Sequence, residues 1–315
     1  MQPQLHIVTP AQRADAKVRS GGHLISVVAH AGLGISRPGG APNRTTLQRA
    51  SRAGVDAVEL DLCTTADQAL VLHHDLRTPR GMPLSALTLP EIRRRGGSPL
   101  TLDDGIEQLS SGQRIVLDLK TSDAVMPIAR WLVQRPDASR FVVCTERVDA
   151  LRALSLRAPS AQIWQTFPNI GRGTHERVAH MFASLFAERG RRAAGLAGDL
   201  AGVIGRMRLQ PNVSLTRLAG VPWRRLLPRL MGAVRDDLGA CGIAVHHALV
   251  TPELCEAAHT QGMTVTAWTV NEPDVARRVA ATGVDMITTD RVNAIRRAVP
   301  TRPHVLTGGR NRVAG

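Results

Sequence analysis

The chain has 315 residues, enough for one large α/β domain or two smaller ones. Its 43% hydrophobic and 21% charged residues are typical of a folded globular protein, which excludes a disordered or fibrous one. No run of 18 or more apolar residues appears, and the opening MQPQLHIVTPAQRADAKVRS lacks the apolar part of a secretory signal, so we expect no transmembrane segment and a cytoplasmic location.

The formal net charge of +14 could attract nucleic acid, anionic lipid or a substrate that bears phosphate. Four phenylalanines and no tyrosine leave few aromatic rings on which single-stranded nucleic acid could stack. No helix-turn-helix or zinc-finger pattern accompanies the charge. We therefore expect no nucleic-acid partner.

Short runs rich in valine and isoleucine alternate with amphipathic helical stretches, the pattern of repeated βα units around a parallel sheet. The candidate strands, eight in number, are ISVVAH ending at His30, DAVELD (56–61), RIVLDLK (114–120), RFVVC (140–144), AQIWQT (161–166), GIAVH (242–246), MTVTAW (263–268) and DMITTD (285–290). Eight parallel strands with helices between them predict an α/β fold, a (β/α)8 TIM barrel that forms a single domain over residues 23–300.

The spacing of the strands is regular except between the fifth and the sixth, where residues 167–240 predict a helical insertion. Twelve arginines and five acidic residues give this segment half of the chain's net positive charge. It could be a solvated cap on the barrel or a surface that contacts anionic lipid. Residues 1–22 and 301–315 have no periodic apolar pattern, so we expect loose tails there.

Carboxylates gather at the ends of two predicted strands. Side chains alternate along a strand, so Glu59 and Asp61 share one face of DAVELD, and Asp118 and Lys120 share one face of RIVLDLK. The C-terminal strand ends of a barrel form its active-site rim. Clustered carboxylates without nearby thiols favour a hard divalent cation, Mg²⁺ or Ca²⁺, which would also offset their mutual repulsion.

Histidines approach the same rim. His30 closes the first strand, and His74 follows Asp61 after a turn short enough to return it to the rim. The adjacent His73 is expected to face away, because only one of two neighbouring residues can face the site. Burying so many polar groups without partners is costly, so their placement together at strand ends indicates a functional site.

The chain resembles the glycerophosphodiester phosphodiesterase family. The motifs that carry the resemblance are AH (29–30), ELD (59–61), VLHHD (71–75), LTLDDGIEQL (100–109), VLDLK (116–120), TAWTVN (266–271) and GVDMITTD (283–290). By this resemblance Glu59, Asp61 and Asp118 would hold one divalent ion. The acid/base pair would be His30 and His74. Lys120 would contact the phosphate and Trp268 would line the pocket.

Three positions depart from the family's usual pattern. Ala31 stands where an arginine usually follows the first histidine, and Asp118 replaces a glutamate that would reach about 1.5 Å further. Arg44 falls where the usual PENTL sequence before the first helix has its glutamate. We hypothesise that Arg44 reaches over the rim and binds the phosphate, with Arg37 as the fallback. Alternatively, Arg44 points to solvent and the ion alone neutralises the phosphate.

The predicted function is metal-dependent hydrolysis of small glycerophosphodiesters to glycerol phosphate and an alcohol, by histidine acid/base catalysis. Two alternatives stay open. One is sphingomyelinase D-like or lysophospholipase D activity on lipid phosphodiesters, for which the basic insertion would contact the lipid. The other, suggested by Ala31 and Arg44, is a catalytically silent barrel that binds phosphodiesters.

Overall fold

A computed structural model describes residues 24–33, 41–168 and 215–301. The predicted strands are all present as β1 (Ser26–Ala29), β2 (Ala57–Thr64), β4 (Arg114–Leu119), β5 (Phe141–Thr145), β6 (Gln162–Phe167), β7 (Gly242–His246), β8 (Thr264–Trp268) and β9 (Met286–Thr289). Each pairs in parallel with its neighbour, and β1 pairs with both β2 and β9, which closes the barrel. The predicted TIM barrel is confirmed.

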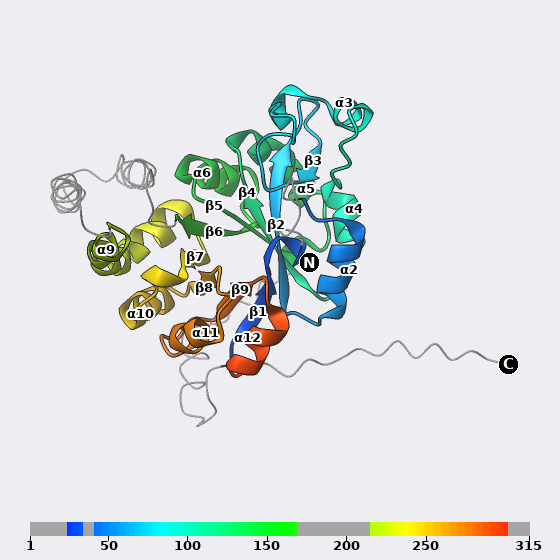
Figure 1. The fold of residues 1–315 in the computed structure, drawn as a ribbon. Helices are drawn as coiled ribbons and strands as arrows, with labels where there is room; N and C mark the ends of the chain where they lie inside the picture. The colour runs from blue at the N-terminus through cyan, green and yellow to red at the C-terminus, as the bar shows by residue number, and fades with distance from the viewer. Residues whose placement is uncertain (1–23, 34–40, 169–214, 302–315) are drawn as a thin grey trace, which may run out of the picture.

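Helices lie between the strands and surround the barrel (Figure 1). They are α2 (Arg44–Arg52), α4 (Leu102–Ile106), α5 (Val125–Val133), α6 (Val148–Arg157), α9 (Leu215–Leu238), α10 (Pro252–Thr260), α11 (Pro273–Ala280) and α12 (Val292–Ala298). In the described part of the chain, none of them is long and apolar enough to cross a membrane.

The alternation of side chains along each strand separates two apolar layers. One set of strand residues packs against the surrounding helices, as Leu60 and Leu117 do. The other set fills the barrel interior, where Trp164 is among the largest fully buried side chains. Gly242 is required opposite this ring, because a Cβ atom there would lie 2.4 Å from the Trp164 Nε1 atom.

A small lobe follows β2 and lies beyond the end of the barrel. We call residues 65–100 the hairpin lobe; it includes β3 (Leu70–Leu72), which pairs antiparallel with β2, and α3 (Leu89–Arg94). Figure 1 shows it projecting from one end of the barrel. Apolar side chains such as Val71, Leu84 and Ile92 give the lobe its own small core. The lobe is thus a folded unit beside the barrel's mouth.

The segment that we expected to be an insertion is partly barrel. From Trp223 onward, α9 buries residues spaced three and four apart, among them Leu226, Leu230 and Val234. They join the main core, and α9 lies against α6 and α10. The C-terminal part of α9 is therefore the ring helix that connects β6 to β7. Residues 169–214 and both predicted tails, apart from Thr301, lie outside the described residues.

Candidate active site

The three predicted carboxylates meet at the C-terminal ends of β2 and β4. Pairing of the two strands sets Asp61 directly beside Asp118, and Glu59 lies two residues earlier on the same face. One oxygen from each residue lies within 4.8 Å of the other two. Asp61 is only 2% exposed and Glu59 8%. Strand register therefore assembles a largely buried carboxylate triad.

The triad is suited to a divalent cation. The Asp61 Oδ2 atom is buried and accepts no hydrogen bond from any residue that the structure describes, which is costly for a carboxylate unless a cation satisfies it. Burial, together with the charge of Asp61, raises the pKa of Glu59 to about 8. A hard cation coordinated by oxygen ligands would satisfy Asp61 and keep the triad ionised. The residues present therefore fit such an ion.

Lys120 provides a positive charge beside the triad. Its Nζ atom lies 2.6 Å from both Asp61 Oδ1 and Asp118 Oδ2. Burial lowers the pKa of Lys120, but the charges of Asp118 and Asp61 outweigh burial and raise it. Lys120 is thus a charged partner of two of the three carboxylates, and its contact with a phosphate stays a prediction.

His30 is fixed at the rim by a carboxylate from the last strand. Its Nδ1 atom lies 2.8 Å from Asp290 Oδ1, and Asn271 donates to Asp290 Oδ2 at 2.6 Å. Burial opposes protonation, but the Asp290 hydrogen bond and the charge of Glu59 outweigh it and raise the pKa of His30. Because an ionised carboxylate only accepts, Nδ1 carries the proton and Nε2 is left to exchange protons.

Ala31, which stands where the family usually has an arginine, lies in a buried turn beside the triad. The residue is 1% exposed and has a left-handed backbone, with φ of 44°. Its backbone N–H donates to Glu59 Oε2 at 2.8 Å. In this chain the position therefore supplies a buried backbone donor to the triad and no side-chain cation.

The two adjacent histidines differ in exposure, since His74 is exposed and His73 is buried. The hairpin of β2 and β3 returns the chain to the rim, where the His73 backbone N–H donates to the Asp61 carbonyl at 3.0 Å. His74 borders the same cavity as the triad, with Nδ1 3.0 Å from Asp75 Oδ1. His73 is 6% exposed, and its Nδ1–H donates to the Asp75 carbonyl at 2.7 Å. His73 thus supports the loop that presents His74.

One cavity of about 290 Å³ lies at the centre of these groups. Its lining includes the triad, Lys120, both predicted catalytic histidines and Trp268. Trp268 stands edge-on to His246, with ring centroids 5.3 Å apart. Arg44 does not border this cavity. Its Nη2 atom is 2.9 Å from Asp104 Oδ1, and its side chain is 54% exposed. The structure therefore supports the alternative in which Arg44 is a surface residue; Arg37 lies outside the described residues.

Two acidic residues at the site were not predicted. Asp290 ends the motif GVDMITTD and pairs with His30, and Glu146 follows β5 and borders the cavity. Both lie at even spacing from inward residues of their strands, Met286 and Cys144. The two-residue alternation that identified Glu59 and Asp61 could have identified them too.

The model of the glycerophosphoryl diester phosphodiesterase family matches residues 43–121 and 207–294, more than half of the chain. The chain belongs to this family. Membership makes it a phosphodiesterase, and residues 122–206, between the two matched stretches, lie outside the match.

Similar proteins and solved structures are consistent with this family membership. The chain is 27% identical over 262 residues to a protein named probable glycerophosphodiester phosphodiesterase 2 from Mycobacterium tuberculosis, covering 79% of this chain and 81% of that relative. A glycerophosphodiester phosphodiesterase structure from Parabacteroides distasonis has a TM-score of 0.61 at 20% identity, over 88% of this chain and 97% of that one. A phosphodiesterase from Oleispira antarctica, in complex with the product sn-glycerol-3-phosphate, has a TM-score of 0.58 at 17% identity, over 87% and 96%.

Proposed function

We propose that this phosphodiesterase hydrolyses glycerophosphodiesters to glycerol phosphate and an alcohol. The observation that carries the proposal is the meeting of two imidazoles, three carboxylates and a lysine around one cavity of about 290 Å³. The name of the Mycobacterium tuberculosis relative and the product bound to the Oleispira antarctica phosphodiesterase support this substrate class.

We propose Glu59, Asp61 and Asp118 as the ligands of one divalent cation, Mg²⁺ or Ca²⁺. When bound, such an ion supplies a Lewis acid that polarises a phosphoryl oxygen. The short Asp118 side chain favours Mg²⁺, the smaller of the two ions. Lys120 lies beside the same carboxylates, where its ammonium group can bind a second phosphoryl oxygen.

His30 and His74 carry the proton transfers in this proposal. One imidazole takes a proton from the attacking oxygen, either of water or of the neighbouring glycerol hydroxyl, as that oxygen bonds to phosphorus. The other gives a proton to the leaving alcohol as its bond to phosphorus breaks. When the glycerol hydroxyl is the attacking group, this step forms a cyclic phosphate, which water then opens to glycerol phosphate. Each Nδ1 faces a carboxylate, of Asp290 or Asp75, which leaves each Nε2 to exchange the proton.

The test is turnover of glycerophosphocholine in Mg²⁺, in Ca²⁺ and after EDTA treatment, beside lysophosphatidylcholine micelles as the lipid substrate. We expect faster turnover of the water-soluble diester and none after EDTA. Asp61→Asn should lower kcat by at least about 10², whereas the surface control Asp104→Asn should not. Preferred turnover of the micelles would favour the lipid alternative. Activity that survives EDTA would refute the cation.

A further inference from the structure

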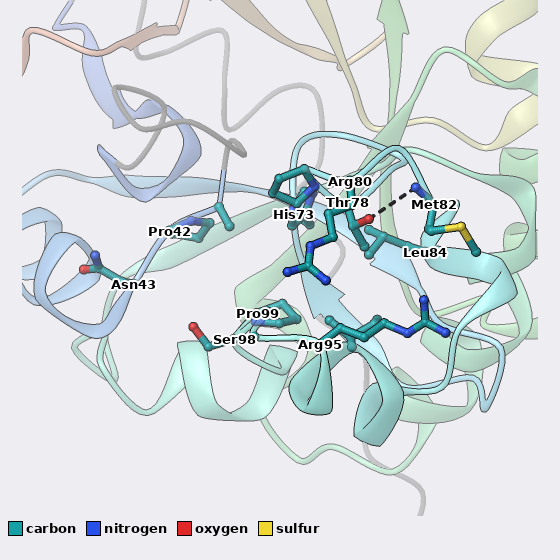
Figure 2. A pocket seen from close by; sticks show the side chains of 15 residues that line it. Pro42, Asn43, His73, Thr78, Arg80, Met82, Leu84, Arg95, Ser98 and Pro99 are labelled. Carbon is teal, nitrogen blue, oxygen red and sulfur yellow. Dashed lines mark hydrogen bonds between the residues drawn. The ribbon is translucent and has the colours of Figure 1, made fainter.

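A second cavity lies outside the catalytic one, between the hairpin lobe and the start of α2 (Figure 2). Its volume of about 560 Å³ falls in the range of small-molecule binding sites. His73 borders this second cavity, while its neighbour His74 borders the catalytic cavity. The two cavities therefore meet at one loop but share no lining residue.

Two arginines reach into the second cavity from different parts of the hairpin lobe. Figure 2 shows Arg80 extending from the turn after Thr78 toward Pro99, and Arg95 lying below Met82 and Leu84 in this view. Among the described residues, neither guanidinium lies within 4.0 Å of a carboxylate. Within the described residues, neither arginine therefore forms an ion pair, although Arg95 lies within electrostatic reach of Glu91.

The charge around these arginines is one-sided. Residues 76–100 contain five arginines and a single acidic residue, Glu91. The Glu91 carboxylate is engaged at the start of α3, where it accepts from the Thr88 backbone N–H at 2.8 Å and from the Thr88 hydroxyl at 2.9 Å. The cavity thus has a local excess of positive charge that favours an anion.

Hydrogen bonds hold the backbone that carries each arginine. The Thr78 N–H donates to the Met82 carbonyl and the Gly81 N–H to the Thr78 carbonyl, both at 2.8 Å. Gly81 has a φ of 81°, which a residue with a side chain rarely adopts. The Arg95 N–H donates to the Glu91 carbonyl at 3.1 Å, at the end of α3. Both arginines therefore project from ordered turns.

Part of the remaining wall of the cavity is apolar. The apolar lining residues that are exposed are Met82, at 39%, and Pro79, whereas Leu84 and Ile92 are buried in the core of the hairpin lobe. The cavity therefore combines a basic side with an apolar side. That combination suits an amphipathic anion better than a bare inorganic one.

We propose that this second cavity binds an organic phosphate, with the phosphate group between Arg80 and Arg95 and an apolar group against Pro79 and Met82. A planar guanidinium group binds two oxygens of a carboxylate or a phosphate, and a phosphate has enough oxygens to bind two guanidinium groups at once, which a single carboxylate does less well. The site is separate from catalysis, because neither arginine borders the catalytic cavity. A soluble phosphate ester and the head group of a phospholipid share this chemistry.

The test is calorimetric titration of the full chain in EDTA with hexyl phosphate and with inorganic phosphate. We expect hexyl phosphate to bind more tightly, and the double variant Arg80→Gln/Arg95→Gln to bind it at least about tenfold more weakly. The matched control is Arg93→Gln/Arg94→Gln, which removes two exposed charges from the same lobe without touching the cavity's lining. Its affinity should stay within about threefold of the parent.

Sedimentation with vesicles that contain phosphatidic acid separates the two sources of the phosphate. Recruitment that depends on Arg80 and Arg95 would identify a lipid head group, and binding of hexyl phosphate alone would identify a soluble ester. Equal losses in the two double variants, or no binding of hexyl phosphate to the parent, would overturn the proposal. Since no measurement involves turnover, a failure of the proposed function leaves these results unaffected.

Discussion

At the scale of single residues, the two adjacent histidines provide a sharp test of which side chain faces the site. His30→Ala and His74→Ala should each lower kcat by on the order of 10² to 10⁴, because each removes a group that exchanges a proton. His73→Ala should leave kcat nearly unchanged and lower the thermal midpoint, because His73 is buried and bonded to Asp75. An inactive His73 variant beside an active His74 variant would contradict this assignment.

Asp290 provides a second test, because it acts through His30. Asp290→Asn keeps a side chain of the same size but removes the charge that helps to raise the pKa of His30. The pKa of His30 should therefore fall, and the limb of the pH–rate profile that His30 controls should move to lower pH. A purely structural role for Asp290 would change kcat without moving either limb. Asp285→Asn is the matched control, since Asp285 pairs with His259 away from the cavity.

Arg44 is the residue on which the structure and our first hypothesis differ. A phosphate clamp would change kcat and kcat/KM together, whereas a surface arginine would change neither. Because Arg44 pairs with Asp104, we expect Arg44→Ala and Arg44→Gln to keep kcat/KM within about threefold, a loss below roughly 0.7 kcal/mol. A tenfold loss on the best substrate would restore the clamp.

At the scale of secondary structure, the packing of α9 shows which part of residues 167–240 belongs to the barrel. Leu230 is fully buried at the centre of its apolar face. Leu230→Ala should therefore lower the free energy of unfolding by about 2–5 kcal/mol, as for other core leucines. Leu156→Ala is the control, because Leu156 on α6 is 80% exposed. Equal thermal midpoints for the two variants would indicate that α9 is an accessory cap.

The strands were predictable because their apolar runs are short and separated, and the alternation along them placed Glu59 and Asp61 correctly. The extent of α9 was not predictable from the sequence. Arginines are interspersed with its apolar residues, and the burial of those residues depends on packing against α6 and α10. Ala31 and Arg44 looked like losses of function in the sequence. Only the left-handed turn at Ala31 and the ion pair of Arg44 show what these residues do.

At the scale of the whole molecule, closure of the barrel brings together groups that are remote in sequence. His30 and Asp290 are 260 positions apart and meet because β1 pairs with β9. Local patterns could predict that both strands exist. They could not predict which carboxylate would reach which histidine, because that depends on the stagger of the closed sheet.

Stability of the whole barrel should depend on the balance of charge at the triad. Lys120 is paired with Asp61 and Asp118, which face it from β2 and β4, and removing one partner of a buried ion pair costs about 3–5 kcal/mol. We therefore expect Lys120→Met to lower the thermal midpoint clearly in EDTA, where nothing else offsets the carboxylates.

A divalent cation bound only by the folded protein stabilises it by mass action, and at the triad it would also replace the lost positive charge. The difference in thermal midpoint between Lys120→Met and the parent should therefore shrink when millimolar Mg²⁺ replaces EDTA. Arg277→Met is the control, because its ion pair with Asp274 is exposed and far from the triad, so its small effect should not depend on Mg²⁺. If the Lys120→Met difference is the same in EDTA and in Mg²⁺, the three carboxylates do not hold a cation that the fold depends on.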